Sequence, residues 1–199
     1  MNHQTRAAFD GLLLHERKLI FVDLETTGAN QLTDRITEIG IVCVERGVVE
    51  QWSTLVNPEM PIPPFIERLT GISNDMVCDA PLFATLAEAL AARLDGGLLI
   101  AHNARFDSGF LKTALEAAGL TLHNDILCTV KLSRKLYPQH AKHSLDTLIS
   151  RHGLQPQARH RALADADLLW QFWQKVQIEI APETFAAALG KVLRRHRGS

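Results

Sequence analysis

The sequence predicts an α/β fold with a mixed sheet, in which an antiparallel meander is followed by parallel strands flanked by helices. Three apolar segments rich in β-forming residues come first, at 19–22, 36–44 and 48–56, with short connections between them. Neighbouring strands joined in this way form an antiparallel meander. From Pro81 onward, segments with helical periodicity alternate with short apolar runs, which is typical of a sheet covered by helices. Hydrophobic residues make up 46% of the 199 residues, which is enough for one sizeable core.

Local signals justify the strands of the meander. Leu19 to Val22 is a near-continuous apolar run, which is typical of a strand buried on both faces. Arg46-Gly47 supplies a turn between the second and third strands, and the proline-rich residues 57–64 then end regular structure.

Glycine, proline and apolar periodicity define the later elements. A glycine closes a helix in the left-handed conformation, and a proline suits the first helical turn. The expected elements are a short helical turn at Ile66–Leu69 closed by Gly71, a helix from Pro81 to Gly96, a strand at Leu98–Ala101, a helix over 104–118, a strand at Asp125–Cys128, a helix ending at Tyr137, a helix at Ser144–His152, a long helix at Arg159–Val176 and an amphipathic helix at Pro182–Arg195.

One domain at residues 1–180, with a short C-terminal helical extension at 181–199, accounts for the chain. The formal net charge is −1, so any contact with nucleic acid would depend on a local groove rather than on a basic field. The three cysteines lack paired spacing, which argues against a disulfide framework or a zinc site. The apolar run Leu12–Leu14 is too short for a signal sequence or a membrane span. We therefore expect a soluble cytoplasmic protein without membrane association.

Two carboxylates emerge from the first strand. Side chains alternate along a strand, so Asp23 and Glu25 point to the same side at its carboxyl end, and Gly28 turns the chain just beyond. At about 4 Å and an effective dielectric of about 20, two such charges repel by about 4 kcal/mol unless a cation joins them. Two other interpretations of Asp-x-Glu stay open at this point. Asp23 could begin a turn beside a solvated Glu25, or it could be the nucleophile of a haloacid-dehalogenase type phosphatase, a family that has Asp where this chain has Glu25.

Two more acids lie on apolar helical faces. Asp107 and Asp165 are each followed by apolar residues at offsets of three, four, seven, eight and eleven, which places both acids on a buried face. A buried acid is unfavourable unless it is capped, paired or bound to metal, whereas Asp167 projects elsewhere and is expected on the surface. With Asp23 and Glu25, the four negative charges match two divalent cations, and oxygen ligands favour Mg²⁺ or Mn²⁺.

His160 comes five residues before Asp165. On an ideal helix the two side chains would be rotated by about 140° from each other, so we expect His160 on a loop ahead of the helix. A histidine there could take a proton from water near neutral pH. Considered alone, it is better explained as a surface residue, one of nine histidines, and only its position before Asp165 indicates a role in the site.

Three segments together resemble the exonuclease motifs of the DEDDh family, which includes the proofreading epsilon subunit of bacterial DNA polymerase III. They are DLETTG at 23–28, HNARFD at 102–107 and HRALAD at 160–165. The resemblance covers about residues 19–176, and a related group would have Tyr in place of His160. It implies a ribonuclease H-like fold and metal-dependent removal of nucleotides from a 3′ end as 5′-monophosphates.

The resemblance also implies roles for the five candidate catalytic residues. Asp23 would bridge two metal ions. Glu25 and Asp165 would complete the first metal site, and Asp107 would support the second. His160 would deprotonate the attacking water as general base.

Substrate contacts are implied at further motif positions. The backbone of Thr26 and Thr27 would approach the terminal nucleotide, and Asn103 would shape the pocket. Phe106 could be a stacking platform or core filler. Single-stranded DNA is the favoured substrate. RNA stays possible because its discrimination depends on contacts with the 2′-hydroxyl group.

The remaining expectations concern phosphate contacts and partners. His140, Lys142 and His143 could contact a phosphate from the loop before Ser144. A DNA polymerase subunit or a fused nuclease domain is a possible partner. The functional alternatives are an exoribonuclease of the same family and a non-catalytic module that binds nucleic-acid ends or a polymerase.

Overall fold

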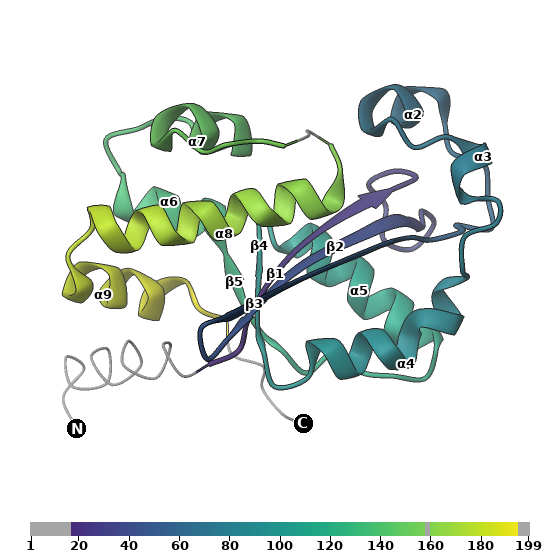
Figure 1. Ribbon diagram of the computed structural model, residues 1–199, viewed down its shortest axis with the longest axis horizontal. Helices are drawn as coiled ribbons and strands as arrows, with labels where there is room; N and C mark the ends of the chain where they lie inside the picture. Colours follow the sequence, from purple (N-terminus) through teal and green to yellow (C-terminus); the bar gives the residue numbers. More distant parts are fainter. Residues whose placement is uncertain (1–16, 158–159, 195–199) are drawn as a thin grey trace.

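The structure is a computed structural model that describes residues 17–157 and 160–194. Over these residues, five strands form one mixed sheet in the order β3-β2-β1-β4-β5 (Figure 1). The antiparallel meander consists of β1 (Leu19–Thr26), β2 (Ile36–Glu45) and β3 (Val48–Leu55). β4 (Leu98–Ala101) pairs in parallel with β1, and β5 (Asp125–Cys128) pairs in parallel with β4. The expected mixed sheet is therefore confirmed.

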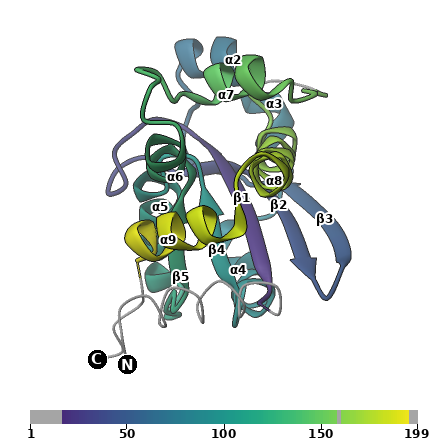
Figure 2. The ribbon, with the colours of Figure 1, turned by 90° about the vertical axis from the view of Figure 1, so that its left-hand side faces the viewer.

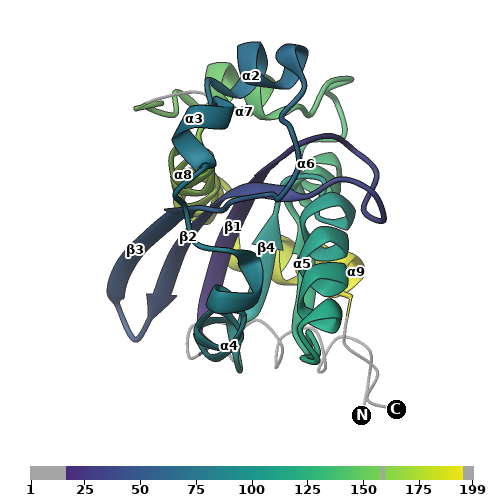
Figure 3. The same cartoon turned by 90° about the vertical axis from the view of Figure 1, so that its right-hand side faces the viewer.

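Helices cover both faces of the sheet. α4 (Phe83–Leu94) and α5 (Arg105–Ala117) pack on one face. The other face carries α6 (Thr129–Leu136), α7 (Leu145–His152), α8 (Ala162–Glu179) and α9 (Pro182–Val192). Figure 2 shows α8 and α9 in front of the strands, and Figure 3, from the opposite side, shows α4 and α5 in front. None of the described helices is both long and apolar enough to cross a membrane.

Two short helices, α2 (Pro64–Thr70) and α3 (Asn74–Val77), follow the proline-rich segment. α2 and α7 lie at the end of the molecule toward which β1 runs (Figures 1 and 3). Gly71 closes α2 in the left-handed conformation, with φ 71°. α3 was not expected from the sequence, although Ser73 caps it by accepting a hydrogen bond from the backbone N–H of Met76. Its single turn is too short to show apolar periodicity.

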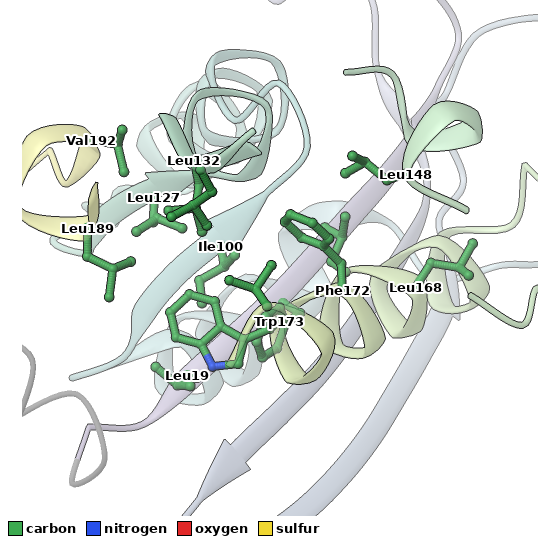
Figure 4. Packing of buried hydrophobic residues seen from close by; sticks show 14 of the residues in the cluster. Leu19, Ile100, Leu127, Leu132, Leu148, Leu168, Phe172, Trp173, Leu189 and Val192 are labelled. Atoms are coloured by element: carbon green, nitrogen blue, oxygen red, sulfur yellow. The ribbon is translucent and has the colours of Figure 1, made fainter. Parts of the chain in front are cut away.

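Strand alternation divides the core into two layers. Leu19 and Phe21 of β1 face α8, whereas Ile20, Val22 and Leu24 face α4 and α5. In the first layer, Phe172 and Trp173 of α8 point toward the strands (Figure 4). β1 is the central strand. Beyond Phe21, the residues of β1 that point toward α8 therefore lie past the core, at the carboxyl edge of the sheet.

The last long helix differs from its expected bounds. It begins at Ala162 and ends at Glu179, whereas the sequence predicts a helix at Arg159–Val176. Arg161 has an extended backbone with φ −132° and ψ 122°, so it precedes the helix. Arg159 lies outside the described residues. The later end adds one turn of helix beyond the apolar stripe that the sequence pattern follows.

α9 packs against the first core layer. Phe185, Leu189 and Val192 are buried there, and the rings of Phe185 and Trp173 meet edge to face with centroids 5.1 Å apart. Arg194 then pairs with Ile126 of β5 through backbone hydrogen bonds. The end of the predicted extension, residues 195–199, lies outside the described residues, and a domain boundary at residue 180 stays a prediction.

Candidate functional site

The carboxyl end of β1 delivers two acidic side chains to the α8 side of the sheet. Asp23 and Glu25 continue the series of Leu19 and Phe21, and both are half-buried. Asp23 pairs with Gly40 of β2, and Glu25 pairs with Glu38. A register irregularity follows Glu25, so regular pairing ends just beyond the two acids.

α8 brings the third acid to the same place. A Cβ atom on Gly40 would lie 2.1 Å from both the carbonyl carbon of Ala162 and the nitrogen of Leu163. Only a glycine therefore allows the first turn of α8 to lie directly on β2. This close approach, beside the strand pair that holds Asp23, places Asp165 opposite the acids of β1.

Asp23, Glu25 and Asp165 form a compact carboxylate cluster. One oxygen from each lies within 4.8 Å of the others. Three carboxylates at this separation repel one another in the absence of a counter-charge. Because every donor is a carboxylate oxygen, the set fits a hard divalent cation such as Mg²⁺ or Mn²⁺.

Asp107 approaches from the opposite layer. It is in the first turn of α5 and is 2% exposed. Burial raises the pKa of its carboxyl group to about 7, although backbone N–H groups of Asp107 itself and Leu24 favour the charged form. A cation near Asp107 would favour the carboxylate, because an adjacent positive charge stabilises the ionised form.

All four acids line one cleft of about 450 Å³. Its walls also include residues from the end of β1 and the loop after it, from α2, from the segment between β4 and α5, and from α5 itself: Thr26, Gly28, Phe65, Leu69, His102, Asn103 and Phe106. The cleft therefore combines an acidic floor with apolar and polar walls. The structure brings all four sequence-derived acids together, three of them in the compact cluster.

The apolar side chains of α2 are site residues that the sequence analysis did not single out. Phe65 is 60% exposed and Leu69 is 52% exposed, whereas Ile66 of the same helix is buried. Apolar residues on both faces of so short a helix are the signal that could have identified them, because one face alone would anchor it. Exposed apolar side chains at a cleft suggest a binding surface.

The predicted substrate-binding residues occupy different positions. Thr26, Asn103 and Phe106 line the cleft. Thr27 is buried, and its hydroxyl oxygen accepts a hydrogen bond of 3.0 Å from the backbone N–H of Arg35. Phe106 is half-buried and packs on Phe110 with ring centroids 4.9 Å apart, so it contributes to the core and to the cleft wall.

His160 lies before α8, as the sequence suggests, and has a left-handed backbone with φ 57°. Its side chain is half-buried and is not among the described residues that line the cleft. His102, which the sequence analysis used only as part of a motif, does line the cleft, and its Nδ1 lies 2.9 Å from the Thr129 hydroxyl oxygen.

The proposed phosphate contact of His143 is wrong in this structure. Its ring is buried, with Nδ1 2.8 Å from the Ser133 hydroxyl oxygen and Nε2 2.9 Å from the His140 carbonyl oxygen. Nδ1 therefore joins the loop to α6, and Nε2 joins His143 to an earlier residue of the same loop. His140 and Lys142 are exposed.

Comparisons with known proteins add to this geometry. A family model described as an exonuclease, RNase_T, matches residues 20–171. A PolC-type DNA polymerase III of Caldanaerobacter subterraneus subsp. tengcongensis is 40% identical over 152 residues, which are 76% of this chain and 11% of that protein. The 3′-5′ exonuclease DinG of Bacillus subtilis is 39% identical over 158 residues, or 78% of this chain and 17% of that protein. The chain thus spans less than a fifth of the length of these relatives.

A solved structure of exonuclease X in complex with 5′ overhanging duplex DNA is also similar. Its TM-score is 0.67 at 28% sequence identity, and the match covers 85% of this chain and 98% of the exonuclease X chain.

Proposed function

This chain belongs to the exonuclease family whose model matches residues 20–171, and from that premise we propose that it is a 3′→5′ exonuclease releasing nucleoside 5′-monophosphates. The observation that carries this proposal is the cluster of Asp23, Glu25 and Asp165, whose oxygens lie within 4.8 Å of one another. Asp107 lines the same cleft. Family membership favours this activity over the phosphatase alternative.

The four acids would hold two divalent cations, Mg²⁺ or Mn²⁺. Asp23, Glu25 and Asp165 would bind one of them, and Asp107 with Asp23 would bind the other. When bound, such ions acidify the attacking water and stabilise negative charge on the phosphate and the leaving 3′-oxygen. The protein contributes a rigid frame, because β1, α5 and α8 are each anchored in the core.

His160 would act as general base. Its position on the loop immediately before α8 puts it five residues before Asp165, which lies in the first turn of that helix. A positioned base contributes roughly 10²- to 10⁴-fold to a hydrolytic rate. We therefore expect His160→Ala to lower kcat by that factor, which steady-state kinetics would measure.

Single-stranded DNA is the proposed substrate. Phe65 and Leu69 of α2 and Phe106 of α5 line the cleft and offer apolar surface to the faces of bases. Stacking on aromatic side chains tolerates any base, because every base has a π-face. The Thr26 hydroxyl donates a hydrogen bond of 2.6 Å to the Gly28 carbonyl oxygen, which orders the backbone that would approach the terminal nucleotide. Hydrolysis of RNA is the second candidate.

A polymerase subunit or a further nuclease domain is the proposed partner. This chain matches only 11% and 17% of its PolC-type and DinG relatives, so in those proteins the matching segment is joined to much additional sequence. The same type of segment could serve a polymerase in proofreading or another enzyme in repair.

The experiment that tests the proposal uses 5′-labelled single-stranded DNA and RNA of matched sequence with Mg²⁺ or Mn²⁺. We expect a descending ladder on DNA that disappears in Asp23→Ala and persists in Asp167→Asn. Asp167 is a suitable control because it lies on α8 yet bonds to Gln51 and Gln171 rather than lining the cleft. A ladder on RNA alone would support RNA, rather than single-stranded DNA, as the substrate. Binding of 3′ ends without cleavage would favour the non-catalytic alternative.

A further inference from the structure

An ion pair between Glu38 of β2 and Arg161 joins the sheet to the start of α8. Nε of Arg161 lies 3.2 and 3.1 Å from the two carboxylate oxygens of Glu38, and its terminal nitrogen lies 2.8 Å from one of them. The Glu38 side chain is only 4% exposed. A planar guanidinium held by two carboxylate oxygens is fixed in direction as well as in distance.

Glu38 also caps α8 from the neighbouring strand. Its second carboxylate oxygen accepts a hydrogen bond of 3.0 Å from the backbone N–H of Ala162, whereas Arg161 at the N-cap position supplies no side-chain cap. A carboxylate at a helix N-terminus satisfies an otherwise unpaired donor and interacts favourably with the helix dipole. Two residues along β2, Gly40 admits the backbone of Ala162 and Leu163. These contacts fix the first turn of α8 on the sheet.

The pair lies between candidate catalytic residues. Glu38 is the register partner of Glu25, and His160 immediately precedes Arg161. His160 has a φ of 57°, which is unfavourable for a residue with a side chain and persists only where its surroundings hold it. Arg161 is the ordered neighbour that can hold it, because its guanidinium is tied to the sheet.

Asp165 has a separate source of order. It lies inside α8, where Leu168, Leu169, Phe172 and Trp173 are buried in the core. His160 lies outside the helix and lacks this packing. Loss of the ion pair should therefore disturb His160 more than the carboxylate cluster. Only the Glu38 side of the pair is buried, since the Arg161 side chain is 44% exposed, so we assign the pair a role in fixing geometry rather than in stability.

We propose that Glu38 and Arg161 are positioning residues that orient His160 for proton abstraction in the exonuclease reaction. This inference rests on the proposed function. Glu38 and Arg161 would then affect the rate of the chemical step, and they would not affect the binding of cation or substrate.

The test compares Glu38→Gln with the wild type. The amide retains the shape of Glu38 but loses its charge and one acceptor. We expect kcat on single-stranded DNA to fall by roughly 10- to 100-fold with little change in KM, because a small misplacement of a reacting group has effects of this size. The affinity for Mn²⁺ should be unchanged. Glu116→Gln is the matched control, because Glu116 forms an exposed ion pair with Lys112 on α5, and it should retain full activity.

A double-mutant comparison identifies the residue through which Glu38 acts. In a His160→Ala background, Glu38→Gln should cause no further loss of kcat. An equal loss in both backgrounds, or a loss of Mn²⁺ affinity, would overturn the positioning role. If His160→Ala itself retained full activity, the general base of the proposed function would be wrong instead. Should Glu38→Gln fail to fold by circular dichroism, Arg161→Lys provides the same comparison, since it keeps the charge and loses the two-point contact.

Discussion

At the residue scale, burial of Asp107 disfavours the charged carboxylate that a cation site requires. Burial raises the pKa of its carboxyl group from 3.8 to about 7. The folded protein therefore binds this proton more tightly than the unfolded chain does. The stability linked to Asp107 is fully present below about pH 4 and is lost as the pH rises through about 7. A divalent cation near the site would offset that loss.

We accordingly predict that Asp107→Asn stabilises the protein without bound cation at pH 8 but removes the proposed exonuclease activity. The gain over wild type should be on the order of 4 kcal/mol at most at pH 8 and should shrink toward zero near pH 4. Thermal unfolding with a chelator across this pH range checks the prediction. The exposed Glu116→Gln should show no such pH dependence. A stability difference that is the same at pH 4 and pH 8 would contradict the assigned cause.

At the element scale, the approach of α8 to β2 determines the site. α8 carries Asp165, β1 carries Asp23 and Glu25, and Gly40 provides the space in which the helix and the sheet meet. Packing at this density leaves no room for an added methyl group. The acidic cluster is thus a property of two elements in contact rather than of either alone.

We predict that Gly40→Ala destabilises the protein by about 1–3 kcal/mol, because overpacking forces the backbone of α8 away from the sheet. Activity should fall as well, since Asp165 moves with the helix. Gly190→Ala is the matched control, because a Cβ atom there meets nothing within 4 Å on α9. It should increase stability by about 0.5–1 kcal/mol. Urea unfolding of both variants measures the difference, and equal stabilities would refute the packing argument.

The exposed face of α2 makes a different prediction. Phe65→Ala should leave stability nearly unchanged, because the side chain is 60% exposed. Stacking of a base on an aromatic ring contributes about 1–3 kcal/mol, so the KM for single-stranded DNA should rise by roughly 5- to 150-fold. Steady-state kinetics measure this effect. Ile178→Ala is the control, since Ile178 is 82% exposed near the end of α8. An unchanged KM in Phe65→Ala would exclude α2 from substrate binding.

At the scale of the whole molecule, one central strand serves both core layers. β1 packs α8 on one side and α4 and α5 on the other, so acids that arrive from opposite layers meet at its carboxyl end. α9 extends the first layer through Phe185, Leu189 and Val192. This arrangement makes the C-terminal helix relevant to the stability of the whole domain.

We therefore predict that Phe185→Ala lowers the free energy of unfolding by about 3–5 kcal/mol, as is typical when a buried aromatic side chain is removed. Its ring contact with Trp173 connects α9 to α8. A single cooperative thermal transition at a lower temperature is the expected result. A separate early transition, or no change, would instead indicate that residues 181–199 are an extension independent of the core.

The sequence by itself determined the strands, most of the helices, and the two acids that the helices bury. The strands at Leu98–Ala101 and Asp125–Cys128 have the expected bounds, because apolar runs between glycine, proline and polar residues are local signals. Helical periodicity likewise indicated the burial of Asp107 and Asp165, and the structure confirms it.

Only the tertiary structure determined which separate segments of the chain contact one another. The extended conformation of Arg161 depends on Glu38, a residue 123 positions away, so no local pattern could place the start of α8 at Ala162. His143 is buried for the same kind of reason, through Ser133 of α6, and the cleft-facing side of α2 depends on its position over the site. Local propensity acts through neighbouring residues, whereas these contacts join segments whose proximity exists only in the folded chain.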